Sequence, residues 1–414
     1  MPKLGYGDGI DKARSLIVWL IFASSFIVIF EPAPCDIMAI LAMTFFFMPG
    51  VNISPTVIPL FGFYSLLMIG YASSYFVNGA DQLGGFFLLS SGYTLLASFF
   101  IACFISEDTV KRFELVKSGY LVGALIATLI ALAAYMDTKG IGASLVKLGA
   151  SPLLFYGRAA GAFKDPNVFS TYLIFAEMLL FQKILLGGSK RQYLNYIWFA
   201  LIFLALFLAF SRGAWTNLLT ACVLLILLTL LTTPSKAMRG RVFLYSFLAV
   251  VIFAVILMVL LSIPEINTIF VDRFQLVKKY DVGETGRFGN QMNAIPLLLG
   301  LPFGFGPYRF DSYFVNAPHN AFLNAFSAAG WLGGVTYFSM VCSNIYIGIR
   351  TIFMKTPFQN FAILVFACLV AVTLQGIQID TEHWRHYYWM IGMMWGLFAA
   401  SVIYQANENA IDDR

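Results

Sequence analysis

Long apolar stretches alternate with short polar ones along the chain, and the apolar stretches have the length of membrane-crossing helices. A helix needs about 20 mainly apolar residues to cross a bilayer core. The pattern predicts an all-α, polytopic integral membrane protein with about 12 transmembrane helices. The apolar segments span residues 15–31, 33–48, 55–77, 82–105, 116–136, 166–186, 194–210, 213–232, 242–263, 321–349, 357–379 and 387–405.

The composition agrees with this pattern. Of the 414 residues, 60% are hydrophobic and 11% are charged, whereas soluble domains are about 45–50% apolar and about 25% charged. A soluble domain and a disordered chain are therefore excluded, and we expect one transmembrane domain over residues 1–414. The five cysteines lie in apolar stretches without a C-x-x-C pair, which indicates neither a disulfide framework nor a zinc site.

Positive charge indicates the orientation of the predicted spans. Cytoplasmic loops are enriched in Lys and Arg, and 15 of the 26 basic residues fall on one side of the map if the N-terminus is inside. They are Lys3, Lys12, Arg14, Lys111, Arg112, Lys117, Lys183, Lys190, Arg191, Lys236, Arg239, Arg241, Arg350, Lys355 and Arg414. We expect an N-in, C-in topology and an uncleaved first span, because no small-residue cleavage site follows that span. Basic residues spread over short loops give no support to nucleic-acid binding.

Two long loops then lie on the outer side, at about 137–165 and 264–320. Loops beyond about 12–15 residues are usually functional or disordered. The second loop contains the run L-P-F-G-F-G-P-Y-R-F-D. Its aromatic residues, glycines and prolines favour a folded loop.

Polar motifs cluster where the even-numbered spans begin. The runs G-R-A-A-G-A-F-K-D-P-N (157–167), S-R-G (211–213), P-H-N (318–320) and D-T-E-H-W-R-H (380–386) precede spans 6, 8, 10 and 12. With the N-terminus inside, these spans run inward, so each motif lies at an outward-facing helix N-terminus. Such termini carry unpaired N–H groups and favour anions.

Within these motifs, Asp165 before Pro166 and Ser211 before span 8 are typical N-caps. Arg158, Arg212 and Arg287 add planar donors that suit phosphate oxygens. If they gather at the outer membrane boundary, the site suits a diphosphate.

Each of these residues also has a plainer interpretation. Arg212 can extend to lipid phosphates at the interface. Arg158 can be structural, Arg287 can be a solvated loop charge, and His319 can be an ordinary capping residue.

The run P-H-N-A-F-L-N-A-F-S-A-A-G-W-L-G-G resembles the signature of the bacterial O-antigen ligase and polysaccharide polymerase family. In this sequence the matching positions are His319, Asn320, Gly330 and Gly333. Three further elements are similar to those of the family: S-R-G-A-W from Ser211, R-A-A-G-A-F-K-D-P-N from 158 to 167, and the loop arginine at 287. The resemblance covers about residues 195–345, which we expect to form the ligase-related region, with a periplasmic loop at 264–320.

The resemblance implies a metal-independent, inverting glycosyltransferase of the bacterial inner membrane that needs no cofactor and acts at the periplasmic face. Its donor is a glycan on undecaprenyl diphosphate. Its acceptor is a hydroxyl of lipid A–core for a ligase, or another lipid-linked repeat unit for a polymerase, as in surface polysaccharide biosynthesis. The sequence leaves ligase and polymerase open.

The residue types suit this chemistry. Arg212, Arg287 and Arg158 would stabilise the leaving diphosphate, where charge develops. His319 would accept the proton of the attacking hydroxyl, because neutral imidazole is available near pH 7. Asn320 would orient the imidazole or a sugar.

Supporting roles at the start of span 6 fall to Asp165 and Asn167, which would shape this helix start or contact a sugar directly. Ser211 would cap span 8 beside Arg212.

Two alternatives stay open. A divalent metal site is one, because Asp380 and Glu382 form an acid-x-acid pair with His383 and His386 nearby. A transporter or flippase for lipid-linked oligosaccharide is the other, because Glu177 and Asp36 lie in predicted spans and ionisable residues there usually have a function.

Overall fold

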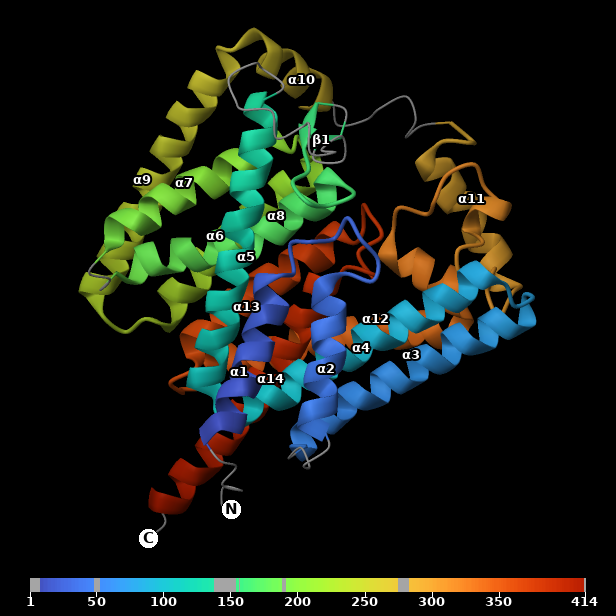
Figure 1. The fold of residues 1–414 in the computed structure, drawn as a ribbon, viewed down its shortest axis with the longest axis horizontal. Coiled ribbons are helices and arrows are strands. Elements are labelled where there is room, and N and C mark those ends of the chain that lie inside the picture. The colour runs from blue at the N-terminus through green and yellow to red at the C-terminus, as the bar shows by residue number, and fades with distance from the viewer. Residues whose placement is uncertain are drawn as a thin grey trace. The chain divides into compact units, whose positions relative to one another are not determined.

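The computed structural model describes residues 8–47, 53–137, 154–155, 157–187, 191–274 and 283–412, and helices dominate this part of the chain (Figure 1). Parts of both predicted outer loops, at 138–153, 156 and 275–282, lie outside the described residues, as do Lys3, Lys190 and Arg414. The chain divides into two compact units. Unit 1 comprises Met1–Asn52 and Glu107–Phe270, and unit 2 comprises Ile53–Ser106 and Val271–Arg414.

The described residues of unit 1 are helical apart from one short strand pair. The strands β1 (Leu154–Phe155) and β2 (Arg158–Ala159) pair antiparallel, with Phe155 opposite Arg158. The central helix α6 packs against α5, α7, α8 and α9 and is buried along most of its length. The helices are α1 (Asp8–Ala23), α2 (Pro34–Phe47), α5 (Thr109–Asp137), α6 (Pro166–Leu186), α7 (Gln192–Leu208), α8 (Arg212–Thr232), α9 (Lys236–Leu261) and, at the end of the unit, α10 (Pro264–Phe274).

Unit 2 is built around α12, which packs against α3, α11, α13 and α14. In Figure 1, α3 and α12 lie side by side over much of their length. A Cβ atom added to Gly70 of α3 would lie 2.8 Å from the backbone nitrogen of Gly333, so the two backbones approach closely because both positions lack a side chain. The elements are η1 (Pro55–Val57), α3 (Ile58–Val77), α4 (Gln82–Glu107), α11 (Arg287–Leu299), η4 (Phe310–Ser312), α12 (Ala321–Phe353), α13 (Gln359–Gln375) and α14 (Arg385–Asp412).

A kink interrupts α12 at Gly330, whose φ of 64° and ψ of −164° are not helical. The loop before α12 fills this break. The backbone N–H of Trp331 donates to the carbonyl of Pro302 at 2.9 Å, and the N–H of Phe305 donates to Ser327 at 2.8 Å. The kink therefore fixes the loop around residues 300–312 against α12.

Each of the twelve predicted apolar segments contains a helix, and the all-α, polytopic fold class is confirmed. Among the described residues, eight helices are long and apolar enough to cross a membrane: α3 with its leading 3₁₀ turn, α4, α5, α6, α8, α9, α12 and α14. The helices α7 and α13 are apolar but shorter, as is the stretch Pro34–Thr44 of α2. The number of spans and the N-in orientation stay predictions.

One boundary differs clearly from the pattern. The first helix ends at Ala23 instead of near residue 31. The hydroxyl of Ser24 donates to the carbonyl of Leu20, and that of Ser25 donates to Phe22. These bonds compete with continuation of the helix, and the prolines at 32 and 34 follow.

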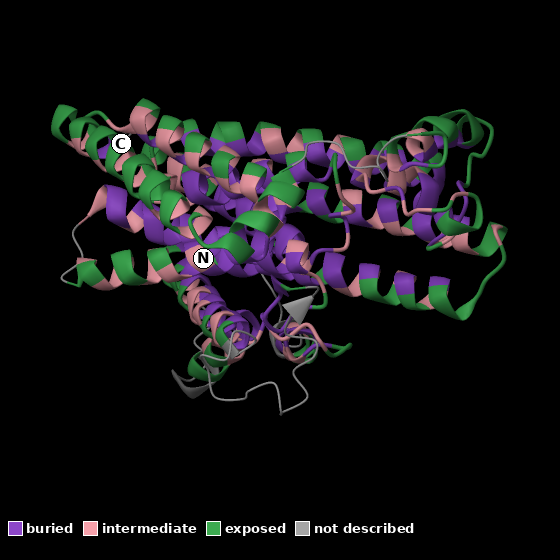
Figure 2. Ribbon diagram, turned by 90° about the horizontal axis from the view of Figure 1, so that it is seen from above, coloured by how far each residue is buried: buried purple, intermediate pink, exposed green. Residues whose placement is uncertain are grey.

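Burial separates two kinds of membrane helix, as the colours of Figure 2 show along the chain. The most apolar window of α9 has a mean hydropathy of 3.0, yet none of it is buried inside the protein, whereas 89% of that window of α6 is buried. An apolar helix whose residues stay exposed on the protein requires lipid around it. We therefore assign α9 to the lipid-facing surface and α6 to the interior of unit 1.

Candidate active site

The start of α6 follows its local sequence. Asp165 has extended backbone angles, and its side chain accepts a hydrogen bond of 2.5 Å from the backbone N–H of Asn167. Pro166 occupies the first helical position, where it needs no hydrogen-bond donor. Asp165 is thus the N-cap that the sequence predicts.

A buried network joins the start of α6 to the start of α8. The Oδ1 atom of Asn167 accepts from the Arg158 guanidinium at 3.1 Å and from the Ser211 hydroxyl at 2.8 Å. The Nε of Arg158 also donates to the carbonyl of Ala209 at 2.8 Å. Arg158 is only 7% exposed and Ser211 only 1%. Arg158, Asn167 and Ser211 therefore form one cluster, and two guanidinium nitrogens of Arg158 hold neighbouring chain segments.

This cluster positions Arg212. Ser211 caps α8 by accepting from the N–H of Ala214 at 3.3 Å, and Arg212 is the first residue of the helix. The preceding residue, Phe210, has a φ of 45°, a left-handed conformation that few non-glycine residues adopt. The sharp turn brings Arg212 to the helix N-terminus, where it is partly exposed.

In unit 2, a carboxylate holds the start of α12. The Oδ1 of Asp380 accepts from the backbone N–H of Asn320 at 2.9 Å, and its Oδ2 accepts from that of His319 at 3.2 Å. The imidazole Nδ1 of His319 lies 3.9 Å from Oδ2. His319 has a φ of 47°, and its side chain is 43% exposed. The base candidate is therefore held by Asp380 and accessible to a ligand.

Asn320 is the N-cap of α12. Its side-chain oxygen accepts from the N–H groups of Phe322 and Leu323, both at 3.0 Å, and its amide donates to the carbonyl of Ile377 at 3.3 Å. These contacts fix the helix start to the segment between α13 and α14. The predicted role of Asn320 toward the imidazole or a sugar stays a prediction.

Helix α11 contacts both the segment that precedes α12 and the segment between α13 and α14. Arg287, its first residue, donates to the carbonyl of Gln378 at 3.5 Å. One turn later, Gln291 donates to the carbonyl of Pro318 at 2.7 Å. Arg287 and His319 are thereby tied to the same two segments, 318–320 and 376–384.

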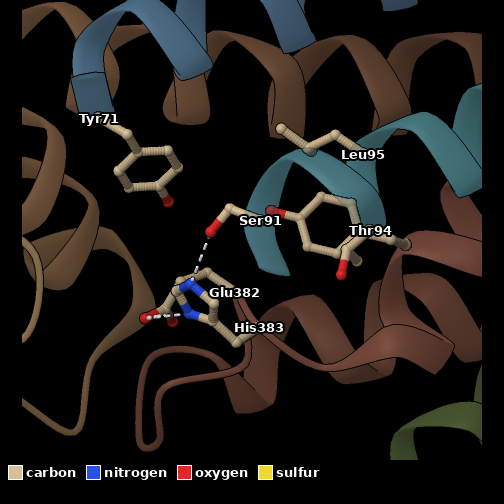
Figure 3. A pocket seen from close by; sticks show the side chains of 7 residues that line it. Tyr71, Ser91, Thr94, Leu95, Glu382 and His383 are labelled. Carbon is tan, nitrogen blue, oxygen red and sulfur yellow. Dashed lines mark hydrogen bonds and ion pairs between the residues drawn. The ribbon is translucent and has the colours of Figure 1, made fainter. Parts of the chain in front are cut away.

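A second polar cluster, centred on Glu382 and His383, follows Asp380 along the chain. Glu382 accepts from the side-chain amide of Asn324, and the Nδ1 of His383 lies 3.6 Å from its Oε1. The Nε2 of His383 forms a hydrogen bond of 3.1 Å with the hydroxyl of Ser91. Glu382, His383 and Ser91, with Tyr71, line a cavity of about 10 Å³, which has room for about one water molecule. In Figure 3 the hydroxyls of Tyr71 and Ser91 are directed toward Glu382 and His383.

The electrostatics of this segment centre on Asp380. Burial, and then the charge of Glu382, raise the pKa of Asp380 from 3.8 to about 8, although its two backbone N–H donors act in the opposite direction. Burial and the neighbouring Glu382 thus favour the protonated form of this carboxyl.

The structure groups the predicted residues within each unit. Arg158, Asp165, Asn167, Ser211 and Arg212 come together at the starts of α6 and α8. In unit 2, His319 and Asn320 donate to Asp380, and Arg287 donates to Gln378 of the same segment. That all four basic candidates act on one substrate stays a prediction.

The sequence reasoning missed the role of Asp380 beside His319, because it treated this aspartate only as part of a metal site. The signal was present, since the D-T-E-H run and the P-H-N run both precede spans on the predicted outer side.

The alternative sites gain little from the geometry. Among the residues described in these two units, no group of three or more His, Cys, Asp or Glu side chains is arranged to hold a metal ion. Asp36 accepts from the backbone N–H of Ala33 at 2.8 Å, as a local turn contact. Glu177 is fully buried in α6.

Comparison with known protein families gives a match to one stretch of the chain. Residues 197–338 match the family model described as O-antigen ligase. The match includes Arg212, Arg287, His319 and Asn320 and ends before Asp380. No curated protein matches the chain.

Proposed function

We propose, from the match of residues 197–338 to the O-antigen ligase family model, that the chain is an inverting glycosyltransferase. It takes a glycan from an undecaprenyl-diphosphate carrier and joins it to an acceptor hydroxyl at the periplasmic face of the inner membrane. The observation that carries this proposal is the start of α12, where Asp380 accepts hydrogen bonds from the backbone N–H groups of His319 and Asn320.

His319 is the proposed general base. Its ring is 43% exposed, and Nδ1 faces Asp380 at 3.9 Å. This distance exceeds a hydrogen bond, but catalytic hydrogen bonds often shorten when substrate binds. With Nδ1–H directed at Asp380, the Nε2 atom is the acceptor for the hydroxyl proton.

Arg212 and Arg287 are the proposed diphosphate ligands. Both occupy the first position of a helix, where the N-terminal N–H groups add positive potential. Arg158 supports a different role, because its Nε and Nη2 donate to Ala209 and Asn167. We assign it to positioning the turn that presents Arg212.

The proposed reaction breaks one bond and forms one. The acceptor oxygen attacks the anomeric carbon as its proton passes to His319 Nε2, and the bond from that carbon to the diphosphate oxygen breaks. The electron pair of that bond remains on the diphosphate, whose added charge the arginines stabilise. Attack from the face opposite the diphosphate inverts the anomeric centre.

The test uses the purified full chain in nanodiscs with an undecaprenyl-diphosphate-linked glycan and no ion gradient. We expect glycan transfer by the wild type and a loss of about 100-fold or more in His319→Ala, because general base catalysis contributes about 10²–10⁴-fold. Arg212→Ala should lower turnover by about 10²–10³-fold, as loss of a charge-stabilising donor does.

The matched control is Ser235→Ala, which removes an exposed helix cap at the start of α9 and should leave transfer unchanged. Wild-type transfer by His319→Ala would exclude it as the base. Movement of the donor across the bilayer without any transfer product would instead support a flippase. Offering lipid A–core and a second lipid-linked repeat unit as separate acceptors distinguishes a ligase from a polymerase.

A further inference from the structure

An exposed aromatic residue stands in the loop before α12, outside the residues considered so far. Tyr308 is 63% exposed and has a φ of 57°. Bulky residues rarely adopt this left-handed conformation, and such strain persists only where the surrounding structure imposes it.

The neighbouring residue imposes it here. The Arg309 guanidinium donates to the carbonyls of Asn78 and Gly79 and, at 2.8 Å, to the carboxylate of Asp81. Two residues before Tyr308, the backbone turns at Gly306, which has a φ of 106°. The Tyr308 backbone is therefore held between two anchors, with its ring presented to solvent.

The ring belongs to a cluster that includes His383. Tyr308 lies edge-on to Phe87, with centroids 5.0 Å apart and an angle of 90° between the planes. Phe87 in turn lies 4.3 Å from the His383 ring. The Tyr308 and His383 rings are 6.5 Å apart and inclined at 31°. Phe87 is 1% exposed, and the more accessible rings of Tyr308 and His383 pack against it.

Polar groups adjoin this cluster. The His383 side chain is 26% exposed, and Glu382, whose side chain is 1% exposed, lies against it. The Oε2 atom of Glu382 has no hydrogen-bond partner among the described residues, although Glu382 lines the small cavity beneath His383 (Figure 3). A buried carboxylate oxygen of this kind requires a donor from water or a ligand.

We propose that Tyr308 and His383, backed by Glu382, bind a pyranose ring of one of the two glycans, which rests on the proposed glycosyl transfer and adds a specificity-determining subsite to it. A pyranose has an apolar face of C–H groups and a rim of hydroxyls. The Tyr308 ring stacks on the apolar face, and His383 with Glu382, directly or through one water, receives the hydroxyls.

The same cluster does not suit a lipid chain. An acyl chain offers no hydrogen-bond donor to the buried Oε2 of Glu382, and a polar atom left unpaired beside it is costly. Ligand sites that combine aromatic walls with a few convergent polar groups recognise amphipathic molecules, and sugars belong to this class.

The test measures binding and transfer separately, with the full chain in nanodiscs. Methyl glycosides of glucose, galactose and N-acetylglucosamine serve as probes in saturation-transfer difference NMR. We expect signals from ring C–H protons of at least one probe with the wild type and with Tyr308→Phe, and their loss in Tyr308→Ala and Tyr308→Leu. In transfer assays, Tyr308→Ala should raise the KM of either the donor or the acceptor about tenfold with little change in kcat, and the affected KM identifies which glycan is bound.

The control is Tyr346→Ala, which removes a tyrosine of similar exposure, 60%, from α12 of the same unit. Unchanged NMR signals and unchanged KM values in Tyr308→Ala and Tyr308→Leu would overturn the subsite, even if His319→Ala abolishes transfer. Probe binding that requires Tyr308, in a protein that transfers no glycan, would support the subsite and reject the proposed function.

Discussion

At the scale of single residues, Asp380 unites several roles in one side chain. It accepts from two consecutive backbone N–H groups and faces the His319 ring. His319 and Asn320 were predictable because they form a local motif. Asp380 lies about 60 residues further along the chain, and no local pattern connects it to them, so only the fold reveals the contact.

The raised pKa of Asp380 predicts a pH-dependent stability. The folded chain keeps a proton on this carboxyl up to about pH 8, whereas the ordinary value is 3.8. Between these values the folded state binds more protons, so the free energy of unfolding falls as pH rises. Asp380→Asn removes this titration. Melting temperatures in nanodiscs should therefore fall less in Asp380→Asn than in wild type from about pH 5 to about pH 9, and parallel profiles would contradict the shift.

At the scale of elements, helix positions followed from apolar runs, and the starts of α6 and α8 followed from Asp165 and Ser211. The sequence did not predict the kink in α12. Residues 321–349 are mainly apolar, and a glycine such as Gly330 is tolerated inside a helical pattern. Its left-handed conformation arises from the loop that packs into the break, which is tertiary information.

The kink gives a prediction with an internal control. A Cβ atom on Gly330 would lie 2.7 Å from the Cα of Phe303, and its φ of 64° disfavours any side chain. Gly330→Ala should lower the free energy of unfolding by about 2–4 kcal/mol. It should also reduce the proposed glycan transfer, because the loop at 300–312 can no longer pack into the kink. Gly62→Ala on α3 meets no atom within 4 Å and should be neutral or slightly stabilising. Equal melting temperatures for the two variants would reject this role of the kink.

At the scale of the whole molecule, hydropathy predicted the class of protein and the helices, while packing decided which helices meet lipid. The sequence alone did not distinguish α6 from α9, since both are apolar for about the length of a bilayer. Their different burial reflects packing, because α6 is surrounded by α5, α7, α8 and α9.

The predicted topology can be tested on residues that the structure exposes. In a variant whose native cysteines are replaced by alanine, Tyr313→Cys should react with a membrane-impermeant maleimide from the outer side. Lys111→Cys, on the predicted inner side, should react only after lysis. Both positions are exposed, so accessibility within the protein does not explain a difference. The reverse labelling pattern would show that the orientation is opposite to the predicted one and would exclude a periplasmic site.

The contact between Asp380 and the start of α12 also bears on modularity. The stretch recognisable as a ligase domain ends at residue 338, whereas the carboxylate that secures its histidine comes from the connection between the last two helices. A chimera that grafts residues 197–338 onto a foreign scaffold would carry the imidazole without its anchor. Transplanting the proposed site thus requires moving both segments together.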